Sequence, residues 1–324
     1  MRFATLHDGT PDGRLHLVSR DNLRCIPTEG VQTLQQLIES WDALAPSLEE
    51  QYAALNASEE GPDFTAAPVM APMPRAWQWL DGSAYDSHGD LMQKVFNHDP
   101  NPKGRPLMYQ GLSDRFYGPL CDIPLPREED GIDFEGEFGV IVDAVPMGST
   151  AAEARAHIRL LVQINDWSLR AVAPVEMKTG FGWIHAKPAC SMAPVAVTPD
   201  ELGAAWRDAR VDLPLAVDLN GAEFGRAEGY PMSYGFDELL AHAACTRDLV
   251  AGTVLGSGTV SNENFREIGS SCMAERRAIE LLDEGAPRTP FLSFGDRVRM
   301  ECRLRDGGAL FGAIDQKVVK GGRA

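Results

Sequence analysis

The sequence predicts an α+β fold that is mainly β, with a small N-terminal unit of residues 1–70 ahead of a larger unit of residues 71–324. Three observations support this prediction. From about Ala71 onward, short runs rich in β-branched residues alternate with Gly and Pro turns; few segments have a helical pattern; and the polar stretch Asn56–Asp63, followed by a Pro-rich stretch, is typical of a linker. Strands without regular β–α alternation argue against a doubly wound parallel sheet.

In the small unit, Met1–Leu6 and Leu15–Ser19 are expected to be strands, because a turn-forming Gly- and Pro-rich segment separates them. A helix follows. Thr33 and Gln36 have the spacing of a capping box. Pro46 is expected to end or kink this helix. Its apolar face consists of Leu34, Leu37, Ile38, Trp41 and Leu44.

In the larger unit, the expected strands are Phe138–Val142, Leu160–Asn165, Val195–Val197, Val211–Leu219 and Arg297–Arg303. One helix should begin after Thr150, where Glu153 completes a second capping box, and should carry Ile158 and Leu161 toward the core. Another should run from about Phe236 to Arg247, with Ser233 as its cap.

Composition excludes several classes of protein. The 324 residues contain 44% hydrophobic and 24% charged residues, as folded soluble proteins do, and the formal net charge is −17. So acidic a chain repels nucleic acids and anionic membrane surfaces, and no run of about eighteen apolar residues suggests a membrane-spanning helix. The six cysteines are scattered without a CxxC pair, which indicates reduced thiols in the cytoplasm.

The segment 133–142, Asp-Phe-Glu-Gly-Glu-Phe-Gly-Val-Ile-Val, is the most informative. In a strand, Glu135 and Glu137 point to one face, about 7 Å apart, while the apolar continuation enters the core. Carboxylates placed so closely at the mouth of a buried strand need a positive charge, and a divalent cation is a compact solution. The alternative is an exposed strand end with solvated or arginine-paired acids. Asp133 is expected to lie just before the strand, in solvent.

Two other segments contribute acids. Asp166 follows a predicted buried strand, and Asp81 stands seven residues before His88 in a turn-rich stretch. An all-oxygen set of Asp81, Glu135, Glu137 and Asp166 suits Mg²⁺ or Ca²⁺, with Mn²⁺ also possible, and does not suit zinc. Spacing alone does not establish that these distant segments meet.

These elements occur in an order that resembles the fumarylacetoacetate hydrolase family. The order is D-x6-H, E-x-E, NDWSLR, a lysine, GSGT and a late glutamate, and the resemblance covers roughly residues 71–320. The E-x-E and NDWSLR elements together are fairly specific. The resemblance implies a mixed β-roll catalytic domain, usually in a homodimer, with a smaller N-terminal domain in the longer members.

The resemblance also implies roles for individual residues. It identifies Asp81, Glu135, Glu137 and Asp166 as metal ligands. It identifies His88 as the base that activates water, Glu275 as its orienting partner, Lys187 as the stabiliser of developing negative charge, and Arg170 as a support of the metal site. The expected substrate contacts are Tyr109, Thr259, Tyr85 and Lys94.

Some of these residues have alternative interpretations. Glu275 could cap a helix that starts near Ser270 or pair with a neighbouring arginine, and Lys187 could face solvent before Pro188. Cys190 and Cys272 lie near the motifs but lack the context of an activated thiolate, so packing is favoured. The GSGT segment lacks the lysine and spacing of a phosphate-binding Walker loop.

The resulting hypothesis is a divalent-metal-dependent hydrolase that cleaves a C–C bond in a small β-diketo acid of fumarylacetoacetate or acylpyruvate type. A decarboxylase or keto–enol tautomerase of oxaloacetate-like acids is one alternative, and a non-catalytic metal- or ligand-binding protein is another. The pattern departs from the fumarylacetoacetate-cleaving enzyme at substrate-side positions, occupied here by Ser83, Asn97, Ala173 and Met177. These departures weaken the case for fumarylacetoacetate itself.

Overall fold

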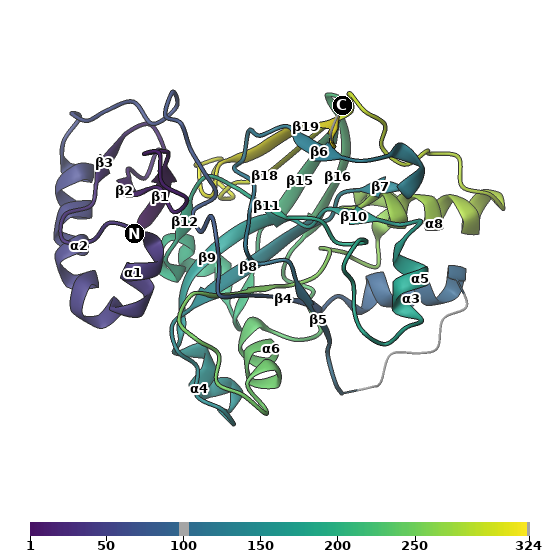
Figure 1. Cartoon of the computed structure of the whole chain (residues 1–324), viewed down its shortest axis with the longest axis horizontal. Coiled ribbons are helices and arrows are strands. Elements are labelled where there is room, and N and C mark those ends of the chain that lie inside the picture. The colour runs from purple at the N-terminus through teal and green to yellow at the C-terminus, as the bar shows by residue number, and fades with distance from the viewer. Residues whose placement is uncertain (97–103, 323–324) are drawn as a thin grey trace.

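The computed structural model describes residues 1–96 and 104–322, and Figure 1 shows the chain arranged around one long sheet, with the N-terminal unit at one end. That unit consists of β1 (Arg2–Leu6), β2 (Arg14–Val18), β3 (Cys25–Pro27), α1 (Leu34–Glu39) and α2 (Trp41–Ala57). The α+β, mainly β fold class is confirmed.

The long sheet has ten strands, nine of them in the order β3-β2-β1-β12-β9-β8-β17-β4-β5, while β11 also pairs with β9. Its remaining strands are β4 (Gln78–Ser83), β5 (Leu107–Gly111), β8 (Gly136–Val142), β9 (Ile158–Asn165), β11 (Ser191–Met192), β12 (Ala196–Val197) and β17 (Thr253–Gly256). Because β1 pairs with β12, the N-terminal strands extend the long sheet and do not form a sheet of their own.

A second sheet of five strands has the order β16-β15-β18-β19-β6. Its strands are β6 (Ile123–Leu125), β15 (Pro214–Leu219), β16 (Ala222–Glu228), β18 (Arg297–Cys302) and β19 (Ala313–Lys320). Two small pairs are β7 (Ile132–Asp133) with β10 (Ser168–Leu169), and β13 (Trp206–Arg207) with β14 (Arg210–Val211). The other helices are α3 (Asp86–Phe96), α4 (Ala151–Arg155), α5 (Ala173–Met177), α6 (Phe236–Ala243), α7 (Phe265–Ile268) and α8 (Met273–Glu284), with 3₁₀ turns η1 (Glu128–Asp130) and η2 (Pro199–Ala205).

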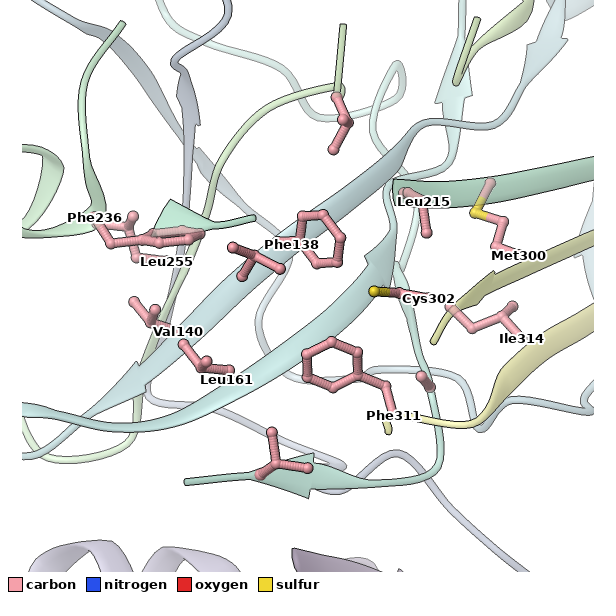
Figure 2. Packing of buried hydrophobic residues seen from close by; sticks show 14 of the residues in the cluster. Phe138, Val140, Leu161, Leu215, Phe236, Leu255, Met300, Cys302, Phe311 and Ile314 are labelled. Carbon is pink, nitrogen blue, oxygen red and sulfur yellow. The ribbon is translucent and has the colours of Figure 1, made fainter. Parts of the chain in front are cut away.

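The main hydrophobic core lies between the two sheets. Figure 2 shows Phe138 of β8 and Phe311 close to side chains from both, and their ring centroids are 6.1 Å apart. A buried glutamine joins the sheets: Gln163 of β9 donates to the carbonyl of Met300 over 3.1 Å and accepts from the backbone N–H of Cys302 over 2.8 Å. This core therefore fixes β8 and β9, the two strands that end at predicted site residues.

Both predicted capping boxes are present, but the helix lengths differ from expectation. The first helix breaks at Ser40, and Pro46 lies inside α2. The free energy gained by packing buried residues such as Leu48 outweighs the loss of the one backbone hydrogen bond that proline cannot donate. The second ends at Arg155, because Ile158 pairs with β8 and starts β9.

Two further boundaries were also predicted wrongly. The helix expected from Phe236 ends at Ala243, and its N-cap is Gly235, whose N–H donates to Glu238, so Ser233 is not the cap. The strand expected over 211–219 is divided between β14 and β15. Among the residues described, no helix has the length and apolar character needed to cross a bilayer.

Candidate active site

The three acidic segments meet because of strand register. In the β8–β9 pair, Gly136 lies opposite Asn165, and the backbone N–H of Asp166 donates to the carbonyl of Glu135 over 2.9 Å. Strand β17 lies between β8 and β4, with Gly256 paired to Asp81 in the parallel direction. This pairing brings the ends of β4, β8 and β9 to one place.

Three of the four predicted metal ligands converge. Single carboxylate oxygens of Asp81, Glu137 and Asp166 all lie within 4.8 Å of one another. Glu137 and Asp166 are fully buried, and Asp81 is 6% exposed. Both oxygens of Glu137 are buried and accept no hydrogen bond within the described part of the chain. The alternative of an exposed, solvated strand end is therefore wrong, although an arginine does pair with one of these acids, Glu135. The trio fits a hard cation bound by oxygen.

The carboxylates of this trio have too little positive charge around them. Burial, followed by the neighbouring carboxylate of Asp166, raises the pKa of Asp81 well above its ordinary value. Burial, followed by the charge of Asp81, raises the pKa of Glu137 in the same way. A divalent cation would reverse both effects, because it favours the ionised form of each carboxylate.

Glu135 differs from the trio because two cationic side chains, Arg170 and Lys187, contact its carboxylate. Oε1 accepts from Lys187 Nζ over 2.6 Å and lies 3.0 Å from Arg170 Nη2, and Oε2 accepts from the Thr259 hydroxyl. Burial acts to raise the pKa of Glu135, but Arg170 and Lys187 outweigh it and hold that pKa well below its usual range. Glu135 therefore stands as an ionised carboxylate beside the trio.

Lys187 is 7% exposed, so the solvent-facing alternative is wrong. Its Nζ donates to Asp166 Oδ2 over 2.5 Å as well as to Glu135. Asp166 also accepts from the hydroxyl of Tyr109 over 2.7 Å and from the thiol of Cys190 over 3.0 Å. The cysteine expected to do no more than pack thus contacts a candidate ligand, although burial raises the pKa of its thiol.

Asp133 is the clearest error of the sequence-based prediction. It is fully buried, not solvated. Its carboxylate accepts from Arg170 Nε over 2.7 Å and from the backbone N–H groups of Met273 and Ala274 over 2.7 and 3.0 Å. Asp133 thereby joins the first turn of α8 to Arg170, which in turn lies against Glu135. The carboxylate also suits the positive end of the helix dipole.

Replacing Asp133 with alanine is expected to destabilise the fold by ~3–5 kcal/mol, because it leaves a largely buried guanidinium and two helix N–H groups without their acceptor. Equilibrium unfolding in urea measures the loss. Asp283→Ala is the matched control: it also removes the partner of an arginine, Arg266, but from an exposed pair, and should cost less than ~1 kcal/mol. Equal losses in the two variants would contradict this role of Asp133.

The predicted acid–base pair is present. His88 on α3 and Glu275 on α8 lie with Nδ1 and Oε1 2.9 Å apart. Glu275 is 1% exposed and His88 is partly buried. Cys272, not Glu275, caps α8, since its sulfur accepts from the Glu275 backbone N–H. Arg276 and Arg277 instead donate to backbone carbonyls, so neither arginine pairs with Glu275, and His88 is its side-chain partner.

The predicted substrate contacts are only partly positioned for that role. Tyr109 and Thr259 lie on the cluster through the contacts above. Tyr85, in contrast, is fully buried in the core with its hydroxyl donating to the carbonyl of Gly229 over 2.7 Å, so it is not placed to bind substrate. Lys94 is exposed on α3. Asn97 lies outside the described residues.

Gly256 is a site residue that sequence reasoning missed. A Cβ atom built at this position would lie 2.6 Å from Asp81 Oδ1 and 2.9 Å from Glu137 Oε2. Any other residue would therefore fill the space among the carboxylates. The backbone N–H of Gly258 also donates to Asp81 Oδ1 over 3.0 Å. The glycines of the GSGT segment were the available signal, and their role is close approach to the acids.

Two family models match this chain. A family model described as "Fumarylacetoacetate (FAA) hydrolase C-terminal" matches residues 78–319, and one described as "Fumarylacetoacetase N-terminal domain 2" matches residues 1–75. The chain is 24% identical over 214 residues to 2,4-didehydro-3-deoxy-L-rhamnonate hydrolase of Sphingomonas sp. (strain SKA58), a match that covers 63% of this chain and 70% of that protein.

A second relative is human mitochondrial oxaloacetate tautomerase FAHD2A, which is 23% identical over 168 residues covering 49% of each chain. Among solved structures, maleylpyruvate hydrolase from Sphingobium sp. SYK-6 in complex with manganese (II) ion and pyruvate superposes with a TM-score of 0.67 at 17% identity, covering 99% of this chain and 100% of that one. These relatives include both hydrolases and a tautomerase. Because the first family model matches residues 78–319, well over half of the chain, the chain belongs to the fumarylacetoacetate hydrolase family.

Proposed function

We propose that this chain is a divalent-metal-dependent hydrolase that cleaves a C–C bond in a β-diketo acid of acylpyruvate type. The observation that carries the proposal is the combination of two features: a buried carboxylate trio without sufficient positive charge, and a histidine paired with a buried glutamate. The β-bridge between Glu135 and Cys272, whose sulfur lies within 4.8 Å of the His88–Glu275 pair, connects the two. The first suits a hard cation, and the second suits activation of water.

Asp81, Glu137 and Asp166 would hold the cation, with Glu135 beside them. Their all-oxygen donor set fits Mg²⁺, Mn²⁺ or Ca²⁺, and the manganese-bound maleylpyruvate hydrolase has the same fold. A bound divalent cation would supply Lewis-acid polarisation of the two carbonyl oxygens of a diketo acid. The residues around it then need to supply a base and a second positive charge.

His88 and Glu275 supply the base. When Nδ1 of His88 carries its proton, it donates to Glu275 Oε1, and Nε2 is left free to accept a proton from water. The carboxylate of Glu275 would also stabilise the imidazolium that forms when His88 takes up that proton. Because Glu275 lies in the first turn of α8, the Asp133 anchor of that helix also fixes the direction of this pair.

Lys187 supplies the second positive charge. Carboxylates on either side raise the pKa of its ammonium despite burial, so it remains protonated. An ammonium held within hydrogen-bond distance of Glu135 and Asp166 adjoins the space in which an enolate leaving group would develop negative charge. Losing such a stabilising donor typically raises a barrier by ~3–4 kcal/mol.

Keto–enol tautomerisation of oxaloacetate-like acids is the second candidate, and the resemblance to the human oxaloacetate tautomerase favours it. Both reactions use an enolate next to a carboxylate-rich site. Hydrolysis also requires a water nucleophile and two products, so product analysis separates the two.

An ultraviolet assay of a panel of acylpyruvates, with oxaloacetate as the tautomerase substrate, tests the proposal. We expect loss of the diketo-acid absorbance with formation of pyruvate and a carboxylic acid in the presence of Mn²⁺ or Mg²⁺. EDTA should abolish the rate, and added metal should restore it. A rate that is indifferent to EDTA would rule out metal dependence. Turnover of oxaloacetate alone, without C–C cleavage, would favour the second candidate.

A further inference from the structure

A second group of side chains with metal-binding chemistry lies where helix α3 meets the start of α8, at the end of the molecule away from the N-terminal unit (Figure 1). The group consists of His88, Cys272 and Glu275. One ligand atom of each, a ring nitrogen, the thiol sulfur and a carboxylate oxygen, lies within 4.8 Å of the other two. The roles proposed above assign His88 and Glu275 to activation of water and give Cys272 only the capping of α8.

The donor atoms of this group differ in kind from those of the carboxylate trio. The trio offers only oxygen, which suits Mg²⁺ or Mn²⁺. A thiolate, an imidazole and one carboxylate form the mixed sulfur, nitrogen and oxygen set that suits zinc. Ligand atoms around a tetrahedral zinc ion lie roughly 3.3–3.8 Å apart. Three atoms that already lie within 4.8 Å of one another therefore need only small side-chain movements to bind such an ion.

An unpartnered buried oxygen indicates that the group lacks a cation. Glu275 is 1% exposed, and its Oε1 lies 2.9 Å from Nδ1 of His88. Its Oε2 is also buried but has no hydrogen-bond partner within the described part of the chain. Among the residues described, His88 is the only basic side chain that pairs with this carboxylate. A buried carboxylate with a free oxygen costs free energy, and a cation that contacts it would remove this cost.

The group is closed toward the core and reachable from solvent at one residue. Cys272 is fully buried, whereas the side chain of His88 is 16% exposed. An ion can thus enter past the imidazole, and water can complete four-coordination on that side. Zn²⁺ bound to a thiolate, a carboxylate and a neutral imidazole carries no net charge, which suits a buried position.

We propose that His88, Cys272 and Glu275 form an inhibitory site for Zn²⁺, separate from the oxygen site of the trio. A neutral imidazole has one free lone pair, and coordination to zinc occupies it. The zinc-bound enzyme therefore has no base at this position, and its Glu275 binds the ion in place of an imidazolium. Zinc binding stands on the geometry alone, whereas inhibition rests on the proposed function.

Titration of the Mn²⁺-loaded enzyme with Zn²⁺ tests the inhibition, with each variant compared with its own zinc-free rate of acylpyruvate hydrolysis. Zn²⁺ should lower kcat of the wild type, and excess Mn²⁺ should not restore it, because the two ions bind different sites. Cys272→Ser keeps a good N-cap for α8 but removes the sulfur ligand. The zinc concentration for half-inhibition should rise at least ~10–100-fold, because loss of a residue that merely supports a ligand already costs that much.

Cys302→Ala, which changes another buried cysteine, on β18, is the matched control and should keep the zinc sensitivity of the wild type. Inhibition that excess Mn²⁺ relieves would place zinc at the trio and overturn the proposal. Equal sensitivity of Cys272→Ser and the wild type would overturn it as well.

Binding of Co²⁺, a spectroscopic substitute for zinc, separates this inference from the proposed reaction. With the trio saturated by Mg²⁺, Co²⁺ should give the wild type a thiolate-to-cobalt charge-transfer band that disappears in Cys272→Ser and remains in Cys302→Ala. That result without turnover of any acylpyruvate would leave the zinc site standing and overturn the proposed hydrolysis. Absence of the band, or its loss in Cys190→Ala, whose thiol contacts Asp166, and not in Cys272→Ser, would overturn the zinc site even if hydrolysis occurs.

Discussion

Replacing His88 with alanine is expected to lower kcat for acylpyruvate hydrolysis by ~10²–10⁴-fold, the usual contribution of a positioned general base. The reason is geometric: His88 on α3 pairs with Glu275 on α8 over 2.9 Å, and Cys272, which lies beside both, forms a β-bridge with Glu135. Stopped-flow or steady-state measurement of diketo-acid loss at saturating substrate gives the change. Binding of Mn²⁺, measured separately, should stay within about twofold, because His88 is not among the oxygen ligands.

Two further variants make the His88 result specific. Glu275→Gln keeps an acceptor for Nδ1 but cannot neutralise an imidazolium, so kcat should fall less steeply than in His88→Ala and the pH profile should shift. His157→Ala is the matched control. His157 also pairs with a carboxylate, that of Asp143, but beyond the opposite end of β8 from Glu135. If His88→Ala hydrolysed acylpyruvates at the wild-type rate, the water-activation step would be wrong.

Replacing Glu137 with glutamine should have two effects of opposite sign. Metal binding should be lost, because a central carboxylate of the trio is removed, while the metal-free protein should become more stable by ~1–2 kcal/mol. Both oxygens of Glu137 are buried without a hydrogen-bond donor, and a neutral amide can instead donate to the neighbouring Asp81. Thermal melts with and without Mn²⁺ measure both effects: the variant should melt higher than wild type in EDTA and gain nothing from the metal.

The pH dependence of the stability of the metal-free protein gives a sharper test. The pKa of Glu137 is raised in the folded state, so the folded chain holds a proton that the unfolded chain has released. The stability of the metal-free wild type should therefore be highest below the unfolded pKa of a glutamate and should fall as pH rises toward the folded-state pKa. Asp81, whose pKa is raised too, adds to this slope.

In EDTA, the difference in stability between the Glu137→Gln variant and the wild type should thus increase as pH rises. Binding of Mn²⁺ to the wild type should release protons. Calorimetry in buffers of different ionisation enthalpy detects that release. Glu301→Gln on β18 is the matched control, because Glu301 is already paired with arginines. Its stability relative to wild type should not increase with pH in this way. A variant less stable than wild type at every pH would contradict the idea that Glu137 lacks a partner in the metal-free protein.

Local sequence determined much of the fold and the chemical identity of the site. The capping boxes at Thr33 and Thr150 and the runs of β-branched residues specify helix starts and strands through contacts only a few residues apart. In the same way, the E-x-E pair and the acid after β9 identify the oxygen donors, because a carboxylate beside a buried strand loses its hydration and requires a positive partner.

Only the tertiary structure decided which acids lie together and which are already paired with a cationic side chain. The register of β8 against β9 and of β17 against β4 brings Asp81, Glu137 and Asp166 together. Glu135, in contrast, forms ion pairs with Lys187 and Arg170, which belong to other segments of the chain. Burial of Asp133 depends likewise on α8, 140 residues away along the chain. Such pairings are set by long-range packing, because the free energy of burying a charge depends on every partner that the fold places around it.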